Sequence, residues 1–363
     1  MILVHCGLHK TGSTSLQHAL AGMSTAEMNG EWKYFASAAM DGDEGPDVRE
    51  AGAFVKEIHK RNAKGKHSIL SSEGFLGSYR DVYNTAGERL TQLLEVLPRD
   101  SLIQIVVFLR PQVDWVESAY RQGVKSGSCL TANEFADRIM ACPNIRFSRL
   151  VEEVQERLPT QLVSFLPYLG SESVLDQFFG LVGLSVPSRY KASLRRNTSL
   201  GGLATEILRR ARCDYGEVLS EASWETLHSA AGVDEGVFCL PPDVRDSLQL
   251  LMQSDWVRMQ RVMRGLDSRR RSDFDRALQS CVARRTAISV SDLGVGDLQS
   301  HYFPLVSRLL GELELRHRRS NRNSLLGFQD LFEGVRRNPG DVPRAVQARL
   351  KGKNRERRIR GAK

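Results

Sequence analysis

A glycine- and hydroxyl-rich loop follows the first apolar run of the chain. Residues 2–6 (ILVHC) lead directly into residues 7–15 (GLHKTGSTS), and apolar residues at helical spacing resume at Leu16. Glycines permit a tight turn, and backbone N–H groups at the start of a helix bind anions. The hydroxyls that would add donors belong to Thr11, Ser13, Thr14 and Ser15. The loop therefore predicts a phosphate or sulfate site, with a well-capped helix start as the simpler alternative.

The position of the lysine separates this loop from the nucleoside-triphosphate loop GxxxxGK[ST]. Gly7 and Gly12 have the right spacing, but Ser13 occupies the lysine position and Lys10 stands three residues earlier. Such NTPases also need a carboxylate for Mg²⁺. Here the most apolar run, residues 102–109, ends at Arg110, a cation. These two departures disfavour Mg²⁺-dependent phosphoryl transfer, although a P-loop kinase or NTPase remains an alternative.

Two segments together resemble the donor site of PAPS-dependent sulfotransferases, where PAPS is 3′-phosphoadenosine 5′-phosphosulfate. Residues 9–17 (HKTGSTSLQ) resemble the loop that binds the 5′-phosphosulfate, and residues 108–122 (FLRPQVDWVESAYRQ) resemble the motif for the 3′-phosphate. In that family, a strand-end arginine and a serine eight residues later hold the 3′-phosphate. Arg110 and Ser118 match this spacing. Residues 71–73 (SSE) resemble bacterial members, and the resemblance covers residues 1–200.

The resemblance implies roles for individual residues. Lys10 would stabilise negative charge on the leaving 5′-phosphate, because an ammonium stays protonated at neutral pH. Gly12 and the hydroxyl residues of the loop would bind the donor, and Asn197, in residues 195–200 (RRNTSL), would lie on the donor side. No metal is expected. The acceptor would be a hydroxyl, most plausibly of a carbohydrate or glycolipid, by analogy with the family alone.

An attacking hydroxyl must also lose its proton. Glu73 follows the apolar residues 68–72, at the edge where parallel sheets bind ligands, and is the candidate general base. His9 could orient Lys10 or the acceptor. His5 and His67 are alternative bases, although His5 lies inside the first apolar run and is more typical of a core histidine.

The elements that must position these residues alternate between apolar runs and helical patterns. Strands are expected at 2–6, 68–72, 102–109 and 161–166, with a helical pattern after each of them, the one after the second at 90–97. Residues 26–66, which include Trp32, are expected to form a loop and helix near the site. This alternation predicts an α/β fold, P-loop-like and three-layered, with a central parallel sheet.

Beyond residue 200 only helical patterns are found, for example at 203–210, 244–263 and 305–315. We therefore expect a sulfotransferase core at 1–200, a helical C-terminal elaboration of the same domain at 201–335 as a candidate acceptor side, and a basic tail at 336–363. The six cysteines are scattered without CxxC spacing, so reduced thiols are expected and a disulfide framework or zinc site is not.

The net charge of +8 is concentrated at one end. Residues 301–363 hold 16 Lys/Arg and 6 Asp/Glu, a net +10, which leaves residues 1–300 at −2. The tail indicates a solvated segment or one that contacts an anionic membrane or polyanion. Nucleic-acid binding is not expected. The absence of a long apolar run predicts a cytoplasmic protein, with a peripheral position at the membrane as the alternative that the basic tail offers. A non-catalytic membrane or polyanion adaptor with a degenerate nucleotide site is the second alternative.

Overall fold

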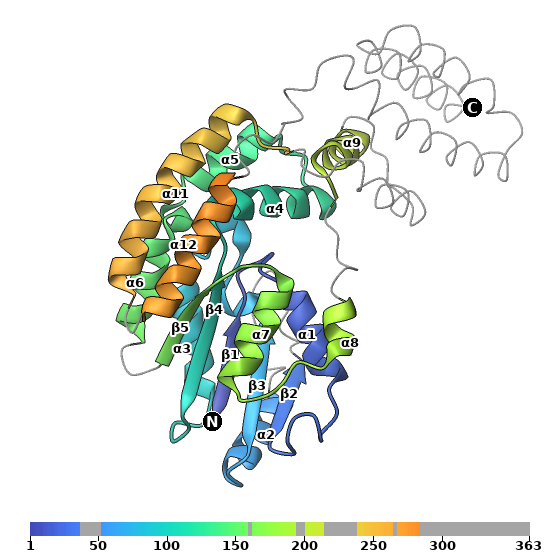
Figure 1. The fold of residues 1–363 in the computed structure, drawn as a ribbon, viewed down its shortest axis with the longest axis vertical. Helices are drawn as coiled ribbons and strands as arrows, with labels where there is room; N and C mark the ends of the chain where they lie inside the picture. Colours follow the sequence, from blue (N-terminus) through green and yellow to red (C-terminus); the bar gives the residue numbers. More distant parts are fainter. Residues whose placement is uncertain (37–51, 159–161, 194–199, 214–237, 264–266, 284–363) are drawn as a thin grey trace, which may run out of the picture. The chain divides into compact units, whose positions relative to one another are not determined.

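The structure, a computed structural model, describes residues 1–36, 52–158, 162–193, 200–213, 238–263 and 267–283 (Figure 1). At its centre is a five-stranded, all-parallel sheet in the order β2-β3-β1-β4-β5. The strands are β1 (Ile2–Cys6), β2 (Trp32–Ala36), β3 (His67–Ser72), β4 (Ile103–Leu109) and β5 (Leu162–Pro167). In the middle of the sheet Val4 pairs with Leu70 on one side and with Ile105 on the other. The predicted α/β class with a central parallel sheet is confirmed.

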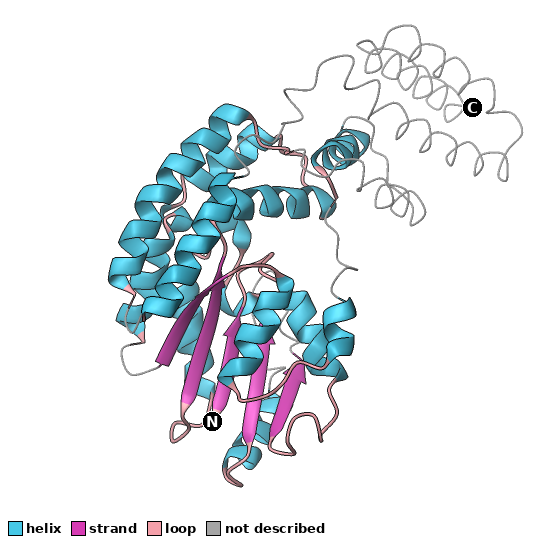
Figure 2. Cartoon of the chain, viewed as in Figure 1, coloured by secondary structure: helices cyan, strands magenta, loops and turns pink. Residues whose placement is uncertain are grey.

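Helices cover both faces of this sheet (Figure 2). Helix α1 (Ser13–Gly22) connects β1 to β2, and α2 (Gly52–Asn62) lies between β2 and β3. The two connections run across the sheet in opposite directions, so right-handed crossovers place α1 and α2 on opposite faces. Helix α3 (Ala86–Val96) precedes β4, and two short 3₁₀ turns, η2 (Gly74–Leu76) and η3 (Tyr79–Asp81), fill the segment between β3 and α3.

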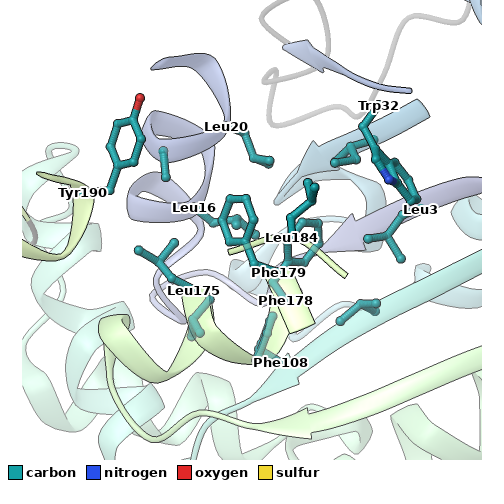
Figure 3. Close-up of a cluster of buried hydrophobic side chains, with 14 of the residues drawn as sticks. Leu3, Leu16, Leu20, Trp32, Phe108, Leu175, Phe178, Phe179, Leu184 and Tyr190 are labelled. Atoms are coloured by element: carbon teal, nitrogen blue, oxygen red, sulfur yellow. The ribbon is translucent and has the colours of Figure 1, made fainter. Parts of the chain in front are cut away.

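A cluster of buried apolar side chains, several of them aromatic, packs between α1 and the sheet. Figure 3 shows Phe178 and Phe179 of α7 (Ser171–Leu181) beside Leu16 of α1 and Phe108 of β4. All four side chains are fully buried. The short helix α8 (Ser188–Ser193) follows α7 and contributes Tyr190 to the same cluster. Burying a large apolar side chain stabilises a fold by roughly 1.5–3 kcal/mol. This packing fixes the first turn of α1 over the end of β1.

A buried polar network anchors the later helices to the sheet domain. Asp255 accepts hydrogen bonds from Ser148 Oγ at 2.6 Å, from the Ser148 backbone N–H and from Gln112 Nε2 at 2.7 Å. Burial raises the pKa of Asp255, although these hydrogen bonds favour the ionised form. The helices of this region are α4 (Gln112–Lys125), α5 (Ala132–Met140), α6 (Phe147–Arg157), α11 (Pro242–Val262) and α12 (Ser268–Ala283), with the 3₁₀ turn η4 (Pro143–Ile145) before α6.

The chain divides into two compact units. One comprises residues 1–119, 133–197 and 242–286 and contains the sheet; the other comprises 120–132, 198–241 and 287–363. In the second unit, α9 (Gly202–Cys213) is joined to residue 129 by a disulfide, Cys129–Cys213. The expectation of reduced thiols was therefore wrong at these two positions. The cysteines are 84 residues apart, and only the fold brings their Cα atoms within 5.5 Å.

The structure also corrects the reading of residues 26–66. Trp32–Ala36 forms the edge strand β2 instead of a loop, paired with β3. Several predictions lie outside the described residues: the helix at 305–315, the basic tail at 336–363 and the segment around Asn197. In the part of the chain that is described, no helix is both long and apolar enough to cross a membrane.

Candidate functional site

The candidate site lies where the sheet changes its direction of winding. The chain builds β1, β2 and β3 on one side, then crosses over to place β4 on the other side of β1. In parallel sheets the carboxyl ends of the strands at such a switch point form the usual ligand-binding crevice. Here those ends carry residues 7–12 after β1 and Arg110 after β4, while Glu73 follows the neighbouring strand β3. The two sequence motifs and the candidate base thus share one edge.

The 7–12 loop is held in a tight conformation that includes two left-handed residues. Lys10 has a φ of 69° and Gly12 a φ of 82°. Thr11 is fully buried and donates from its hydroxyl to the Leu8 carbonyl at 2.6 Å and from its backbone N–H to the same oxygen at 3.3 Å. A lysine in the left-handed region is unfavourable compared with glycine. This conformation places Lys10 at the turn itself.

The start of α1 offers hydrogen-bond donors. Its N-cap is Gly12, which has no side-chain cap, and its first turn contains no acidic residue. Ser13 is 1% exposed, and its Oγ has no hydrogen-bond partner within the described residues. Thr14 is exposed and Ser15 half-buried. An unpaired buried hydroxyl beside free helical N–H groups fits an anion, because a helix N-terminus favours negative charge.

Close approach explains the glycine at position 7. A Cβ at Gly7 would lie 1.9 Å from Ser13 Oγ and 3.1 Å from Ser13 Cβ. The Ser13 hydroxyl therefore lies against the backbone at the beginning of the loop, inside its turn. Any larger residue at position 7 would displace that hydroxyl.

Arg110 connects the second motif to the loop. Its Nη1 donates to the Lys10 carbonyl oxygen at 2.9 Å, and its guanidinium carbon lies 5.2 Å from the centre of the Tyr168 ring. Its Nε is buried and has no hydrogen-bond partner in the described ranges. Ser118, two turns into α4, is 6% exposed. Arg110 therefore has one N–H bonded to the loop and a second, buried N–H available to a ligand.

His9 and Glu73 come together on the other side of the loop. His9 Nε2 lies 3.7 Å from Glu73 Oε2, with the two side chains 19% and 28% exposed. On its other side the His9 ring faces two tyrosines, with ring centres 5.0 Å from Tyr79 and 5.9 Å from Tyr83. The Tyr83 hydroxyl accepts a hydrogen bond from the His9 backbone N–H at 2.7 Å. The carboxylate and the imidazole thus lie within ion-pair distance of each other, next to Lys10 in the chain.

The other two histidines that were considered as bases are placed elsewhere. His5 is fully buried, its Nδ1 lies 2.8 Å from Ser71 Oγ, and burial lowers its pKa to about 3. It is a neutral core side chain that packs against Phe108 and Phe178. His67 begins β3, at the amino edge of the sheet, so it lies at the opposite end of the strand from Glu73.

The structure therefore brings most of the predicted site residues to one edge and adds others. The members shown there are Lys10, His9, Glu73, Arg110 and the loop residues from Thr11 to Ser15. Tyr83 and Tyr168 were missed, because neither stands in a recognisable motif; only the turn after η3 and the end of β5 bring them to the site. Asn197 lies outside the described residues.

Searches of protein-family models and of curated proteins found no match to this chain.

Proposed function

We propose that this protein is a sulfotransferase with a P-loop-like fold that transfers a sulfuryl group from PAPS to an acceptor hydroxyl. The observation that carries the proposal is the hydrogen bond from Arg110 Nη1 to the Lys10 carbonyl oxygen. It joins the two segments that resemble the 5′-phosphosulfate loop and the 3′-phosphate motif. This hydrogen bond between residues 100 positions apart supports a single donor site built from both segments.

The residues present fit a nucleotide that carries two anionic groups. The unpartnered Ser13 Oγ and the start of α1 suit a 5′-phosphosulfate, and the unpartnered Arg110 Nε suits a phosphate. Thr14, Ser15 and Ser118 would supply further hydroxyl donors. The donor-side role of Asn197, which lies outside the described residues, stays a prediction.

The transfer itself requires positioning and charge stabilisation. The acceptor oxygen forms a bond to sulfur while the bond from sulfur to the bridging oxygen of the 5′-phosphate breaks. That electron pair stays on the phosphate of the leaving product, adenosine 3′,5′-bisphosphate (PAP). Lys10 stabilises the charge that develops there, and Glu73 takes the proton that the acceptor hydroxyl loses. No metal takes part in this scheme.

The acceptor is proposed to be a carbohydrate or glycolipid hydroxyl, and this rests on the family resemblance alone. A peripheral membrane contact is proposed from the positive charge of the tail, and a cytoplasmic location from the lack of a long apolar run in the sequence. The Cys129–Cys213 disulfide counts against the cytoplasm, because such bonds persist mainly in oxidising compartments.

A binding experiment distinguishes this function from that of an ATP-dependent enzyme. Isothermal titration calorimetry of the full chain should show tighter binding of PAP than of ATP with Mg²⁺. Adenosine 5′-monophosphate, which lacks the 3′-phosphate, should bind more weakly than PAP. In the Arg110→Ala variant the difference in affinity between PAP and adenosine 5′-monophosphate should disappear. It should remain in the Arg99→Ala variant, which removes an exposed arginine. Preference for ATP would refute the proposal.

Transfer of ³⁵S from labelled PAPS to a panel of polysaccharide, glycolipid and small hydroxyl acceptors then tests catalysis. Lys10→Ala should lose turnover, whereas Lys60→Ala, which removes an exposed lysine on α2, should not. Glu73→Gln should lose rate but still bind PAP, and Glu95→Gln on the exposed side of α3 is its matched control. Full activity in Glu73→Gln would rule out Glu73 as the base. Removal of residues 351–363 should leave turnover intact, unlike in a tail-dependent adaptor.

A further inference from the structure

Tyr83 occupies a buried position next to His9 of the loop. It is fully buried, its φ is 57°, and its ring neighbours the rings of His9 and Trp115, each with a centre 5.9 Å away. The Asn144 side-chain amide donates to the Tyr83 carbonyl oxygen at 3.2 Å. Packing and hydrogen bonding therefore fix where the phenol oxygen lies.

The phenol makes two contacts with the same histidine. Its oxygen accepts the His9 backbone N–H at 2.7 Å and lies 3.1 Å from His9 Nδ1. Burial raises the pKa of Tyr83 well above its usual value, so the hydroxyl keeps its proton. Among the described residues, His9 Nδ1 is the acceptor within reach of that proton. Tyr83 must therefore donate to Nδ1.

This donation determines which ring nitrogen of His9 carries hydrogen. With Nδ1 acting as an acceptor, neutral His9 is protonated on Nε2, the nitrogen that lies 3.7 Å from Glu73 Oε2. An Nε2–H group presents a donor to the carboxylate and has no lone pair with which to accept the proton of a substrate. The geometry thus distinguishes between the two candidate bases at the site.

We propose that Tyr83 is a positioning residue that holds His9 in its Nε2–H form, so that His9 orients Glu73 and Glu73 alone accepts the acceptor's proton. The catalytic part of this inference rests on the proposed sulfotransferase function. The hydrogen-bonding part does not, since it concerns only Tyr83 and His9.

The tautomer can be measured directly. In full-length protein labelled with ¹⁵N-histidine, long-range ¹H–¹⁵N spectra distinguish a protonated from an unprotonated ring nitrogen, and His9→Gln identifies the His9 signals among those of the eight histidines. The wild type should show Nε2 protonated and Nδ1 unprotonated. Tyr83→Phe should move both shifts towards the average of the two tautomers. Protonation at Nδ1 in the wild type would overturn the proposal, even if Tyr83→Phe did not fold.

Tyr79→Phe is the matched control. Its ring lies 5.0 Å from that of His9, but its buried hydroxyl has no hydrogen-bond partner in the described part of the chain. It should leave the His9 shifts unchanged. If Tyr79→Phe shifted them as far as Tyr83→Phe does, the effect would come from ring packing, and the proposal would be wrong.

Transfer kinetics test the catalytic part. Tyr83→Phe should lower kcat about tenfold or more, with KM for PAPS within about twofold, because the base loses its orientation while the donor site is intact. An unchanged kcat despite a shifted tautomer would overturn the positioning role. If the wild type transferred no sulfuryl group, the proposed function would fail instead, and the spectra would still decide the Tyr83–His9 hydrogen bond.

Discussion

Lys10→Gly changes two properties of the 7–12 loop at once. It removes the ammonium that is proposed to stabilise the leaving phosphate, and it also removes the Cβ from a residue whose φ is 69°. The hydrogen bond from Arg110 goes to the backbone carbonyl of this residue, so it survives the substitution. Lys10→Ala removes the same charge but keeps the Cβ. Comparing the two variants separates the conformation of the loop from its chemistry.

The two variants should differ in their free energy of unfolding but lose turnover to the same extent. A residue with a Cβ in the left-handed region destabilises the folded state by roughly 1–2 kcal/mol. Glycine avoids this cost, but its greater conformational entropy in the unfolded chain destabilises the folded state by about 0.5–1 kcal/mol. Lys10→Gly should therefore be more stable than Lys10→Ala by about 0.5–1 kcal/mol. Loss of a charge-stabilising group lowers kcat by about 10²–10³-fold. Both variants should lose turnover to that extent and still bind PAP.

Urea denaturation gives the free energies of unfolding, ³⁵S transfer gives kcat, and calorimetry gives the affinity for PAP. The Lys60→Ala variant is the control for loss of a surface lysine. If Lys10→Gly were less stable than Lys10→Ala, the backbone reasoning would be wrong. If either variant kept wild-type kcat, Lys10 would have no role in stabilising the leaving group.

Three further results are expected. Gly7→Ala should weaken PAP binding about tenfold by displacing the Ser13 hydroxyl, and calorimetry on Ser13→Ala, which should show a similar loss, checks this cause. Asp255→Ala should lower the free energy of unfolding in urea by about 3 kcal/mol, because it leaves the buried donors of Ser148 and Gln112 without their acceptor. Because burial raises the folded-state pKa of Asp255, stability relative to Asp255→Asn should increase as the pH falls from above that pKa towards 3.8. Replacing both Cys129 and Cys213 by serine should destabilise the second unit by about 4–5 kcal/mol, given the 84-residue separation, and an unchanged thermal transition would contradict this.

The sheet was largely predictable because its inner strands are buried on both faces. Residues 103–109 form an unbroken apolar run apart from Gln104, and such a run is typical of a central parallel strand. Strand β2 was missed because it is a short edge strand whose Lys33 is half exposed, so it lacks that signature. The same periodicity that located the strands also placed Glu73 and Arg110 at strand ends.

Contacts between distant residues left no signal in the sequence. The Cys129–Cys213 pair has no motif spacing, and pairing depends on how α9 lies against the segment after α4. Tyr83 was missed for a similar reason. Its hydroxyl contacts His9, 74 residues away in the sequence. The turn that brings it there has left-handed residues at Val82 and Tyr83, where the sequence has no glycine to indicate such a conformation. Local patterns predicted which side chains carry charge, but not which neighbours orient them.

The Arg110–Lys10 hydrogen bond has a consequence for how this site can change through mutation. The guanidinium contacts a main-chain oxygen, so this hydrogen bond does not depend on the side-chain atoms at position 10. Arg110 therefore helps to hold the shape of the loop, whereas the side chain of Lys10 supplies its charge. Under the proposed function, a single substitution of the lysine would remove the charge that stabilises the leaving group, while the hydrogen bond that holds the loop would stay in place.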